Sequence, residues 1–346
     1  MNPLVWTLMI TTLSTSTIIT MSSHHWILAW LGLELNTLSI LPIIVKPNHP
    51  RAIEATTKYF IIQTLAAAMI LFATTMNAWQ TGNWDITLSS SPLWNTIILS
   101  ALLLKLGIAP AHLWYPDIIQ GVNLYTALII STWQKLAPLT LLYLTINHMP
   151  TSILLLAGTL SVLTGGVAGL NQTQTRKILA FSSIAHMGWL IIALSMNPRL
   201  ATLTLITYLL MTTTVFLSFA TTNTKTLQDL GTAWSHSPAL MATTTMTLMS
   251  LGGLPPLTGF MPKLLILKEL TGMGLTLAST TLALLSLPSL YFYTRMAYFA
   301  TLTTPPNTIC MKHKWRFMKN LKTNTPTIAV MATMLLPITP LLYMQV

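Results

Sequence analysis

Charged residues, and acidic ones above all, are scarce in this chain. Of its 346 residues only 6 are Asp or Glu and 17 are Lys or Arg, so 7% are charged. A soluble globular protein carries roughly a quarter charged residues, so this chain has too few to cover a water-facing surface. The net charge of +11 would suggest nucleic-acid binding in a soluble protein, but the location of the charges, given below, argues against it.

Cysteine is almost absent as well. The single residue Cys310 excludes an internal disulfide, a CxxC redox pair and a cysteine-held iron–sulfur cluster. We interpret it as an incidental loop thiol, because a reactive cysteine needs a specific microenvironment. The start Met1-Asn2-Pro3 has neither a basic signal-peptide region nor an Arg-rich amphipathic presequence, so the first apolar segment is expected to remain as a spanning helix.

The chain contains long apolar runs, and 53% of its residues are hydrophobic. Runs of about twenty residues suit transmembrane helices, which satisfy their own backbone hydrogen bonds, whereas β-barrel strands alternate apolar and polar residues. The sequence predicts an all-α, polytopic transmembrane helical bundle of about eleven spans. Its many Thr and Ser hydroxyls suit either helix packing or a hydrated interior. The spans are expected near residues 3–20, 26–45, 57–78, 93–109, 123–146, 151–170, 177–196, 200–221, 238–270, 274–300 and 324–345.

The loops predict the orientation of the chain in the membrane. Loops after odd-numbered spans carry little positive charge beyond Arg199, whereas loops after even-numbered spans are basic. The positive-inside rule therefore places the N-terminus inside and, with an odd number of spans, the C-terminus outside. We interpret the basic run 312–316 as a topology signal that contacts anionic lipid rather than nucleic acid. The basic residues of the even loops are Lys46, Arg51, Lys58, Arg176, Lys177, Lys225, Lys312, Lys314, Arg316, Lys319 and Lys322.

Four of the charged residues inside the predicted spans are the informative ones: Glu34, Lys105, Lys135 and Lys263. A charge at the bilayer centre costs about 2.5–3.5 kcal/mol even on the lenient insertion scale, so such residues are functional candidates by default. Glu34 lies roughly 12 Å along its helix from Trp26, and Lys105 roughly 18 Å from the start of its own helix. Both are thus near mid-depth, and we expect them to form a pair.

Lysine in such a place suits proton transfer. Burial disfavours its charged form and a nearby carboxylate favours it, so the group can change charge when its neighbour changes. Moving one charge through 100 mV costs about 2.3 kcal/mol. A shift in the pKa of a buried lysine, caused by a change in its neighbour, can supply a free energy of this size. His112 and His186 are candidate relays between the lysines, although each is equally well explained as a hydrogen-bonded packing histidine.

Two spans should be broken. The fourth contains Gly107 and Pro110, and the ninth contains Gly253, Pro255 and Pro256. Proline interrupts a helix, and paired interrupted spans in two halves of a chain indicate the ion path of a transporter. We expect one transmembrane domain, 1–346, with a first repeat at about 1–146 and a second at about 151–300. Because each repeat has an odd number of spans, the second is inverted; a basic loop and last helix occupy about 301–346.

The residues around these charges and breaks resemble a known family. The segments are Trp30–Asn36, Lys105–Gly107 with Pro110-Ala111-His112 and Pro116-Asp117, and Gly252–Pro256 followed by Gly259-Phe260 and Lys263. Together they resemble the mitochondrially encoded NADH dehydrogenase subunit 2 family, the antiporter-like membrane-arm subunits of respiratory complex I. The resemblance extends over most of the chain.

The resemblance implies a function and a location. It implies a proton-translocating subunit in which Glu34 and Lys105 form the charge pair of one half-channel, Lys135 is the central relay and Lys263 controls the other exit. NADH, FMN, iron–sulfur clusters and ubiquinone belong to other subunits, so no cofactor or metal is expected in this chain. The implied partners are other membrane-arm subunits and anionic lipids, and the implied location is the mitochondrial inner membrane. The N-terminus would face the matrix and the C-terminus the intermembrane space.

Two other functions remain open on the sequence. A free-standing cation/proton antiporter would use the same buried lysines without redox partners. A structural membrane scaffold would use the charges only to fix helix packing.

Overall fold

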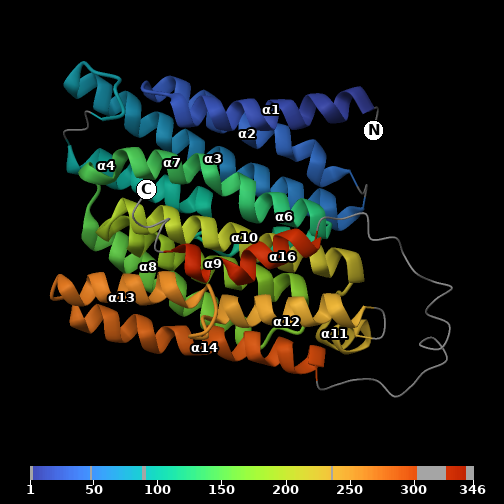
Figure 1. Ribbon diagram of the computed structural model, residues 1–346. Coiled ribbons are helices and arrows are strands. Elements are labelled where there is room, and N and C mark those ends of the chain that lie inside the picture. The colour runs from blue at the N-terminus through green and yellow to red at the C-terminus, as the bar shows by residue number, and fades with distance from the viewer. Residues whose placement is uncertain (1–2, 47–48, 88–90, 235–236, 302–324, 340–346) are drawn as a thin grey trace. The chain divides into compact units, whose positions relative to one another are not determined.

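The computed structural model describes residues 3–46, 49–87, 91–234, 237–301 and 325–339. Within these ranges the chain is helical and contains no strand, which confirms the all-α prediction (Figure 1). Seven of the described helices are long and apolar enough to cross a membrane. The basic run at 312–322, Cys310 and the end of the last predicted span lie outside the described residues.

The chain forms two compact units, Met1–Leu160 and Ser161–Val346. In the first unit, α1, α2 and α3 pack in sequence order, and α3 also packs against α4. The helix α8 (Thr151–Leu170) spans the boundary between the units. The first unit contains α1 (Pro3–Ser22), α2 (Trp26–Val45), α3 (Pro50–Thr81), α4 (Pro92–Leu106), α5 (Trp114–Gly121), α6 (Leu124–Thr132), η1 (Trp133–Lys135), α7 (Leu136–Thr145) and η2 (Ile146–His148).

The second unit is built from described α-helices that range from 7 residues in α11 to 26 in α14. In it α12 packs against α14 and α10, and α16 packs against α10 and α12. The short α11 was not foreseen from the sequence. The elements are α9 (Thr175–Met196), α10 (Pro198–Thr222), α11 (Leu227–Ala233), α12 (Pro238–Gly252), α13 (Phe260–Gly272), α14 (Thr276–Thr301), α16 (Thr325–Met334) and η4 (Leu336–Ile338).

Local sequence signals explain where several helices begin. His49 caps α3 by accepting a hydrogen bond from the Arg51 N–H, and Pro50 occupies the first turn. Asn197 caps α10 in the same way by accepting from the Arg199 N–H. A capping side chain satisfies one free N–H group, and proline at the first position loses nothing because its missing N–H has no helical partner.

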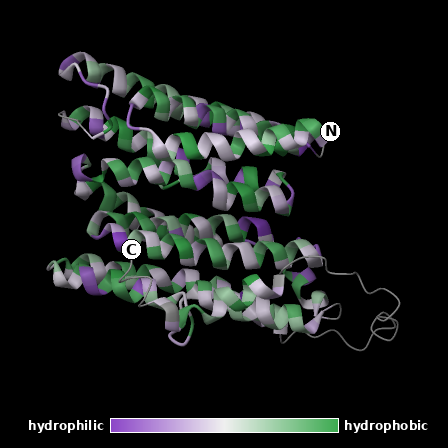
Figure 2. Cartoon of the chain, turned by 45° about the horizontal axis from the view of Figure 1, so that its top comes forward, coloured by the Kyte–Doolittle hydropathy of each residue, from purple (hydrophilic) through white to green (hydrophobic). Residues whose placement is uncertain are grey.

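The outer faces of the helices suit lipid. Figure 2 shows helices that are apolar or weakly polar along most of their length, and large apolar side chains such as Leu8, Ile61 and Leu156 are exposed. Most Thr and Ser hydroxyls donate to a carbonyl one turn earlier in their own helix, as Thr20 does to Thr17 O (2.7 Å). The hydrogen-bonding capacity of the Thr and Ser hydroxyls is therefore largely satisfied within single helices. These side chains do not need a water-facing surface.

At one end of the second unit, loop backbone is held by polar side chains. Arg295 on α14 donates to Leu170 O (2.6 Å) and Gln172 O (2.8 Å) at the end of α8. Thr226 and Asp229 form a capping box at the start of α11. Burial raises the pKa of Asp229, but hydrogen bonds from the Thr226 and Lys225 backbone outweigh this and hold it below its usual range.

Candidate functional site

The fourth predicted span is broken as expected. Helix α4 ends at Leu106, and the capping residue that follows, Gly107, has the left-handed φ of 71° that favours glycine. The Ile108 N–H donates to Leu103 O (3.1 Å), so the last turn of α4 is closed by the C-terminal motif typical of glycine. The chain then passes through a cis Ala109–Pro110 bond before α5 begins at Trp114.

The ninth predicted span breaks in the same manner. Helix α12 ends at Gly252 and is capped by Gly253, with φ of 86°, and the Leu254 N–H donates to Met249 O (3.4 Å). The chain resumes as α13 at Phe260. Both predicted interruptions are confirmed, and both leave the carbonyl end of a helix inside the predicted span.

Lys105 lies in the last turn of α4, next to the first break, and is 6% exposed. Its Nζ donates to Gln63 O on α3 (3.4 Å), and Gln63 Nε2 donates back to Lys105 O (3.4 Å). Two long hydrogen bonds thus tie the lysine to the middle of α3. They hold the side chain without neutralising its charge.

Glu34 is partly buried on α2, and its Oε2 accepts a hydrogen bond from Thr37 Oγ1 (3.2 Å). Among the described residues, the ion pairs join Lys58 to Glu54 and to Asp117, and none joins Glu34 to Lys105. The expected pairing of Glu34 with Lys105 is therefore not a contact ion pair in this structure.

Lys135 occupies a third interruption that the sequence did not lead us to expect. The fifth span changes from α6 to the 3₁₀ turn η1 and then to α7, and Lys135 closes the 3₁₀ turn. Pro138 explains the change, because it lacks the N–H group that would bond the Gln134 carbonyl in a regular helix. Lys135 is 4% exposed, and its Nζ lies 5.0 Å from the centre of the Tyr115 ring on α5, a cation–π distance.

Uncharged polar side chains link the helices around Lys135. Gln134 Nε2 donates to Asn36 Oδ1 on α2 (3.1 Å), and Tyr59 on α3 donates to Gln134 Oε1 (3.3 Å). Asn36 and Tyr59 are buried. This Tyr59–Gln134–Asn36 chain joins the segments that carry Glu34 and Lys135. The only sequence signal for it was polar residues inside apolar runs, which we did not assign to the site.

Replacing Gln134 by Met should lower the stability of the first unit. The change leaves the Asn36 amide oxygen and the Tyr59 hydroxyl unpaired, at a cost of about 1–3 kcal/mol. The loss would be measured as a lower melting temperature of the purified protein. The neighbouring exposed Trp133 provides the control, because Trp133→Leu should stay within about 0.5 kcal/mol. Equal effects of the two changes would contradict the role of Gln134.

In the second unit, Lys263 lies on α13, after the break, and reaches back to the end of α12. Its Nζ donates to Gly252 O (2.9 Å) and Leu251 O (3.4 Å), and lies 6.0 Å from the centre of the Trp189 ring. Lys105 precedes its break, whereas Lys263 follows its own. The ammonium group therefore interacts with the partially negative carbonyl end of a helix.

The two histidines have different surroundings. His186 Nε2 lies 3.3 Å from the Tyr293 hydroxyl, and its ring lies 5.7 Å from that of Tyr208. His112 lies in the first break, with Nδ1 at 3.2 Å from Pro110 O. His186 thus belongs to a buried aromatic cluster of the second unit, and His112 to the turn that leads into α5.

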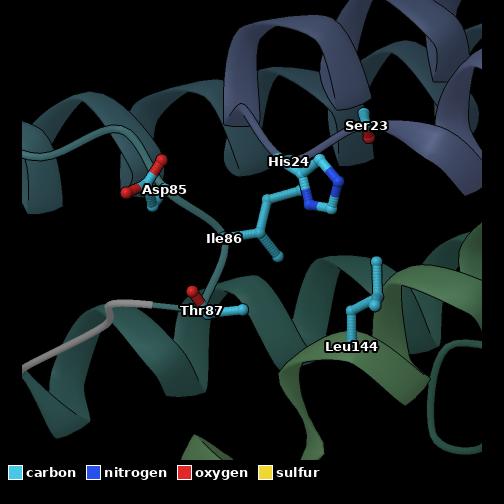
Figure 3. A pocket seen from close by; sticks show the side chains of 6 residues that line it. All are labelled: Ser23, His24, Asp85, Ile86, Thr87 and Leu144. Atoms are coloured by element: carbon cyan, nitrogen blue, oxygen red, sulfur yellow. The ribbon is translucent and has the colours of Figure 1, made fainter.

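Metal ligands and pockets give no further candidate for the site. No group of three His, Cys, Asp or Glu side chains in the described ranges could hold a metal ion. A pocket of about 240 Å³ is lined by Ser23, His24, Asp85, Ile86, Thr87 and Leu144 (Figure 3). It lies at the turn between α1 and α2, and none of the candidate lysines lines it.

Comparison with known proteins relates this arrangement to a family. Residues 23–289 match a family model described as NADH:quinone oxidoreductase/Mrp antiporter, TM, and residues 290–343 match one described as NADH dehydrogenase subunit 2 C-terminus. Among curated relatives, the NADH-ubiquinone oxidoreductase chain 2 of Salmo salar is 52% identical and that of Carassius auratus 53%, each over 98% of both chains. That of Gallus gallus is 51% identical over 99% of both chains.

Solved structures give the same fold. A chain of respiratory complex I from Thermus thermophilus with bound aureothin superposes with a TM-score of 0.85 at 26% identity, covering 97% of this chain and 78% of that one. A chain of an archaeal membrane-bound sulfane sulfur reductase, at 16% identity, shares the fold with a TM-score of 0.81 over 97% of this chain and 74% of that one. With family models that together span residues 23–343 and relatives more than 50% identical over nearly the whole length, the chain belongs to the NADH:quinone oxidoreductase/Mrp antiporter transmembrane family, on its NADH-ubiquinone oxidoreductase chain 2 branch.

Proposed function

We propose that this chain is a proton-translocating membrane subunit of respiratory complex I. Its relatives are NADH-ubiquinone oxidoreductase subunits matched over their full length. The observation that carries the proposal is the position of Lys105, Lys135 and Lys263, each of which lies at an interruption of a helix inside an otherwise apolar span. Interrupted backbone at membrane depth is tolerated only against protein or a water-filled cavity.

In the first unit the proposed steps run from Glu34 and Lys105 to Lys135. A proton that arrives near Lys105 would change the charge felt by Glu34, because a nearby charge shifts the proton affinity of a carboxylate. Gln63 holds the ammonium group of Lys105 in place, and Tyr59, Gln134 and Asn36 tie together the segments between the charges. Lys135, over the Tyr115 ring, is the proposed central relay.

In the second unit Lys263 is the proposed exit. Its ammonium group donates to the α12 carbonyls, so release of its proton would remove a favourable interaction with the helix end. His186 and Tyr293, which lie on α9 and α14, are the titratable groups proposed to connect with it. The relay roles of His112 and His186 are part of this proposal.

Two repeats of five spans are also proposed, at about 1–146 and 151–300. Their broken helices support this organisation, since α4 and α12 each have 15 residues, begin with proline and end at a left-handed glycine. The starts of α3 and α10 support it as well, with a capping residue, Pro and Arg in each. Because five is odd, the second repeat would be inverted, and a last helix would bring the total to eleven spans.

The orientation follows from the basic loops, and two single cysteines test it. In a Cys310→Ser background, Lys225→Cys should react with a membrane-impermeant thiol reagent only from the matrix side. Asn83→Cys, in the loop after α3, should react only from the intermembrane side. Both positions are exposed, so access is not limited by packing. Labelling of both from one side would contradict the proposed topology.

Purification in mild detergent tests the assignment to complex I. We expect the chain to co-migrate with bound flavin and with NADH-oxidising activity. Other subunits of the complex would bind NADH, FMN, the iron–sulfur clusters and ubiquinone. The partners proposed are the neighbouring membrane-arm subunits and anionic lipids of the mitochondrial inner membrane. An isolated chain that exchanges cations for protons would instead support a free-standing antiporter.

A further inference from the structure

Two buried side-chain amides near one end of the α3–α4 pair have hydrogen-bonding atoms without partners among the described residues. Asn77 on α3 is 1% exposed, and neither its Nδ2 nor its Oδ1 has a partner. Asn95 on α4 is 4% exposed, and its Oδ1 has none. Its Nδ2 donates to His148 O (3.2 Å), which fixes which way the Asn95 amide points.

The packing of α3 against α4 places these amides at the same level. Trp94 Nε1 donates to Gln80 Oε1 (2.8 Å), which sets the register of the two helices near this end. Asn77 lies one turn before Gln80, and Asn95 directly follows Trp94, so both lie just inside that hydrogen bond. Both amides are buried, and no hydrogen bond joins them.

The three unpaired atoms match the hydrogen-bonding capacity of one water molecule. Asn77 Oδ1 and Asn95 Oδ1 each need a donor, and Asn77 Nδ2 needs an acceptor. Water has two O–H donors and accepts through its oxygen, so a single molecule can satisfy all three. Buried amides without partners are rare and costly, and buried waters typically make about three hydrogen bonds to groups of this kind.

We propose that the first unit binds a water molecule between Asn77 and Asn95, at the end of α3 and α4 that meets η2. The water donates to Asn77 Oδ1 and Asn95 Oδ1 and accepts from Asn77 Nδ2. Through the Asn95–His148 hydrogen bond it connects α3 and α4 to the end of the fifth span. This site goes beyond the proposed proton path.

An apolar layer separates the water site from Lys105. Along α4, the side chains of Ile98, Leu99 and Leu102 between Asn95 and Lys105 are fully buried, as are Ile70 and Ala73 on α3. These five side chains cannot form hydrogen bonds across the layer, because all of them are aliphatic. The water is therefore held at one end of the bundle and stabilises the helix ends there.

The test is a map of the assembled complex at a resolution that shows ordered water, for the wild type and for Asn77→Leu. We expect density at about 3 Å from Asn77 Nδ2 and Asn95 Oδ1 in the wild type, and its loss in Asn77→Leu. The matched control is Thr74→Val, one turn away on α3. Thr74 is buried and its hydroxyl already donates to Leu71 O (3.0 Å), so this change should leave the density in place.

Each outcome decides the proposal. Density bound by all three atoms in the wild type and in Thr74→Val supports it. A dry contact in the wild type, or density that persists in Asn77→Leu, overturns it. If Asn77→Leu does not assemble, the wild-type and Thr74→Val maps still give the answer. None of these results depends on proton pumping, so failure here is distinguishable from failure of the proposed function.

Discussion

Replacing Lys105 by Met should stop proton translocation while the complex still assembles. Met keeps the length of the buried side chain but removes the charge near Glu34 and the hydrogen bond to Gln63 O. A thioether can neither take up nor release a proton, so the proposed path loses a titratable group, and about 1.4 kcal/mol on a barrier already changes a rate tenfold. We therefore expect NADH-driven proton uptake by closed vesicles to fall about tenfold or more, with assembly followed on native gels.

Two further variants separate proton relay from helix packing. Lys105→Arg keeps a positive charge, but a guanidinium group does not release its proton near neutral pH. It should therefore assemble and still fail to pump. Lys46→Met, which removes an exposed lysine at the end of α2, should pump normally. Retained assembly with unchanged pumping in Lys105→Met would support the scaffold function and contradict the proton path.

Replacing Gly259 by Ala should strongly destabilise the second unit. A Cβ atom at Gly259 would overlap Ser250 O on α12. The loop cannot easily move away, because the adjacent Thr258 donates to Ala332 O on α16 (2.7 Å). Overpacking of this kind costs about 1–3 kcal/mol and occasionally more, and overlap with backbone puts this case at the upper end.

The matched control for Gly259 is Gly272 at the end of α13. A Cβ atom there would meet nothing within 4 Å, so Gly272→Ala should leave the melting temperature of the purified complex nearly unchanged. Gly259→Ala should lower that temperature or reduce the amount of assembled complex. Similar behaviour of the two variants would show that the break between α12 and α13 is not packed as described.

The positions of the helices were predictable from the sequence, because a helix that crosses the hydrocarbon core of a membrane needs a continuous run of apolar residues. The run 26–45 coincides with α2 and the run 151–170 with α8. The breaks after α4 and α12 were predictable from glycine and proline, whose effect on a helix is local. The ends were less predictable, and α3 begins before the expected 57–78 because its His49–Pro50 cap lies beyond the apolar run.

The contacts within the site were not predictable from the same signals. The 3₁₀ turn at Lys135 depends on Pro138, which was not assigned as a helix breaker because the apolar pattern continues past it. The partners of Lys105 and Lys135, namely Gln63 and Tyr115, come from other helices and required knowledge of the packing. The expected depth of Glu34 in the membrane placed it near Lys105, but depth gives no information on side-chain direction.

In the proposed mechanism, Glu34, Lys105, Lys135 and Lys263 lie along one connected hydrated route. The most direct test is a map of the intact complex in which ordered water is resolved around these four side chains. We expect a chain of water and polar groups that joins them through the membrane. Four side chains separated from one another by dry, close-packed apolar residues would contradict the mechanism.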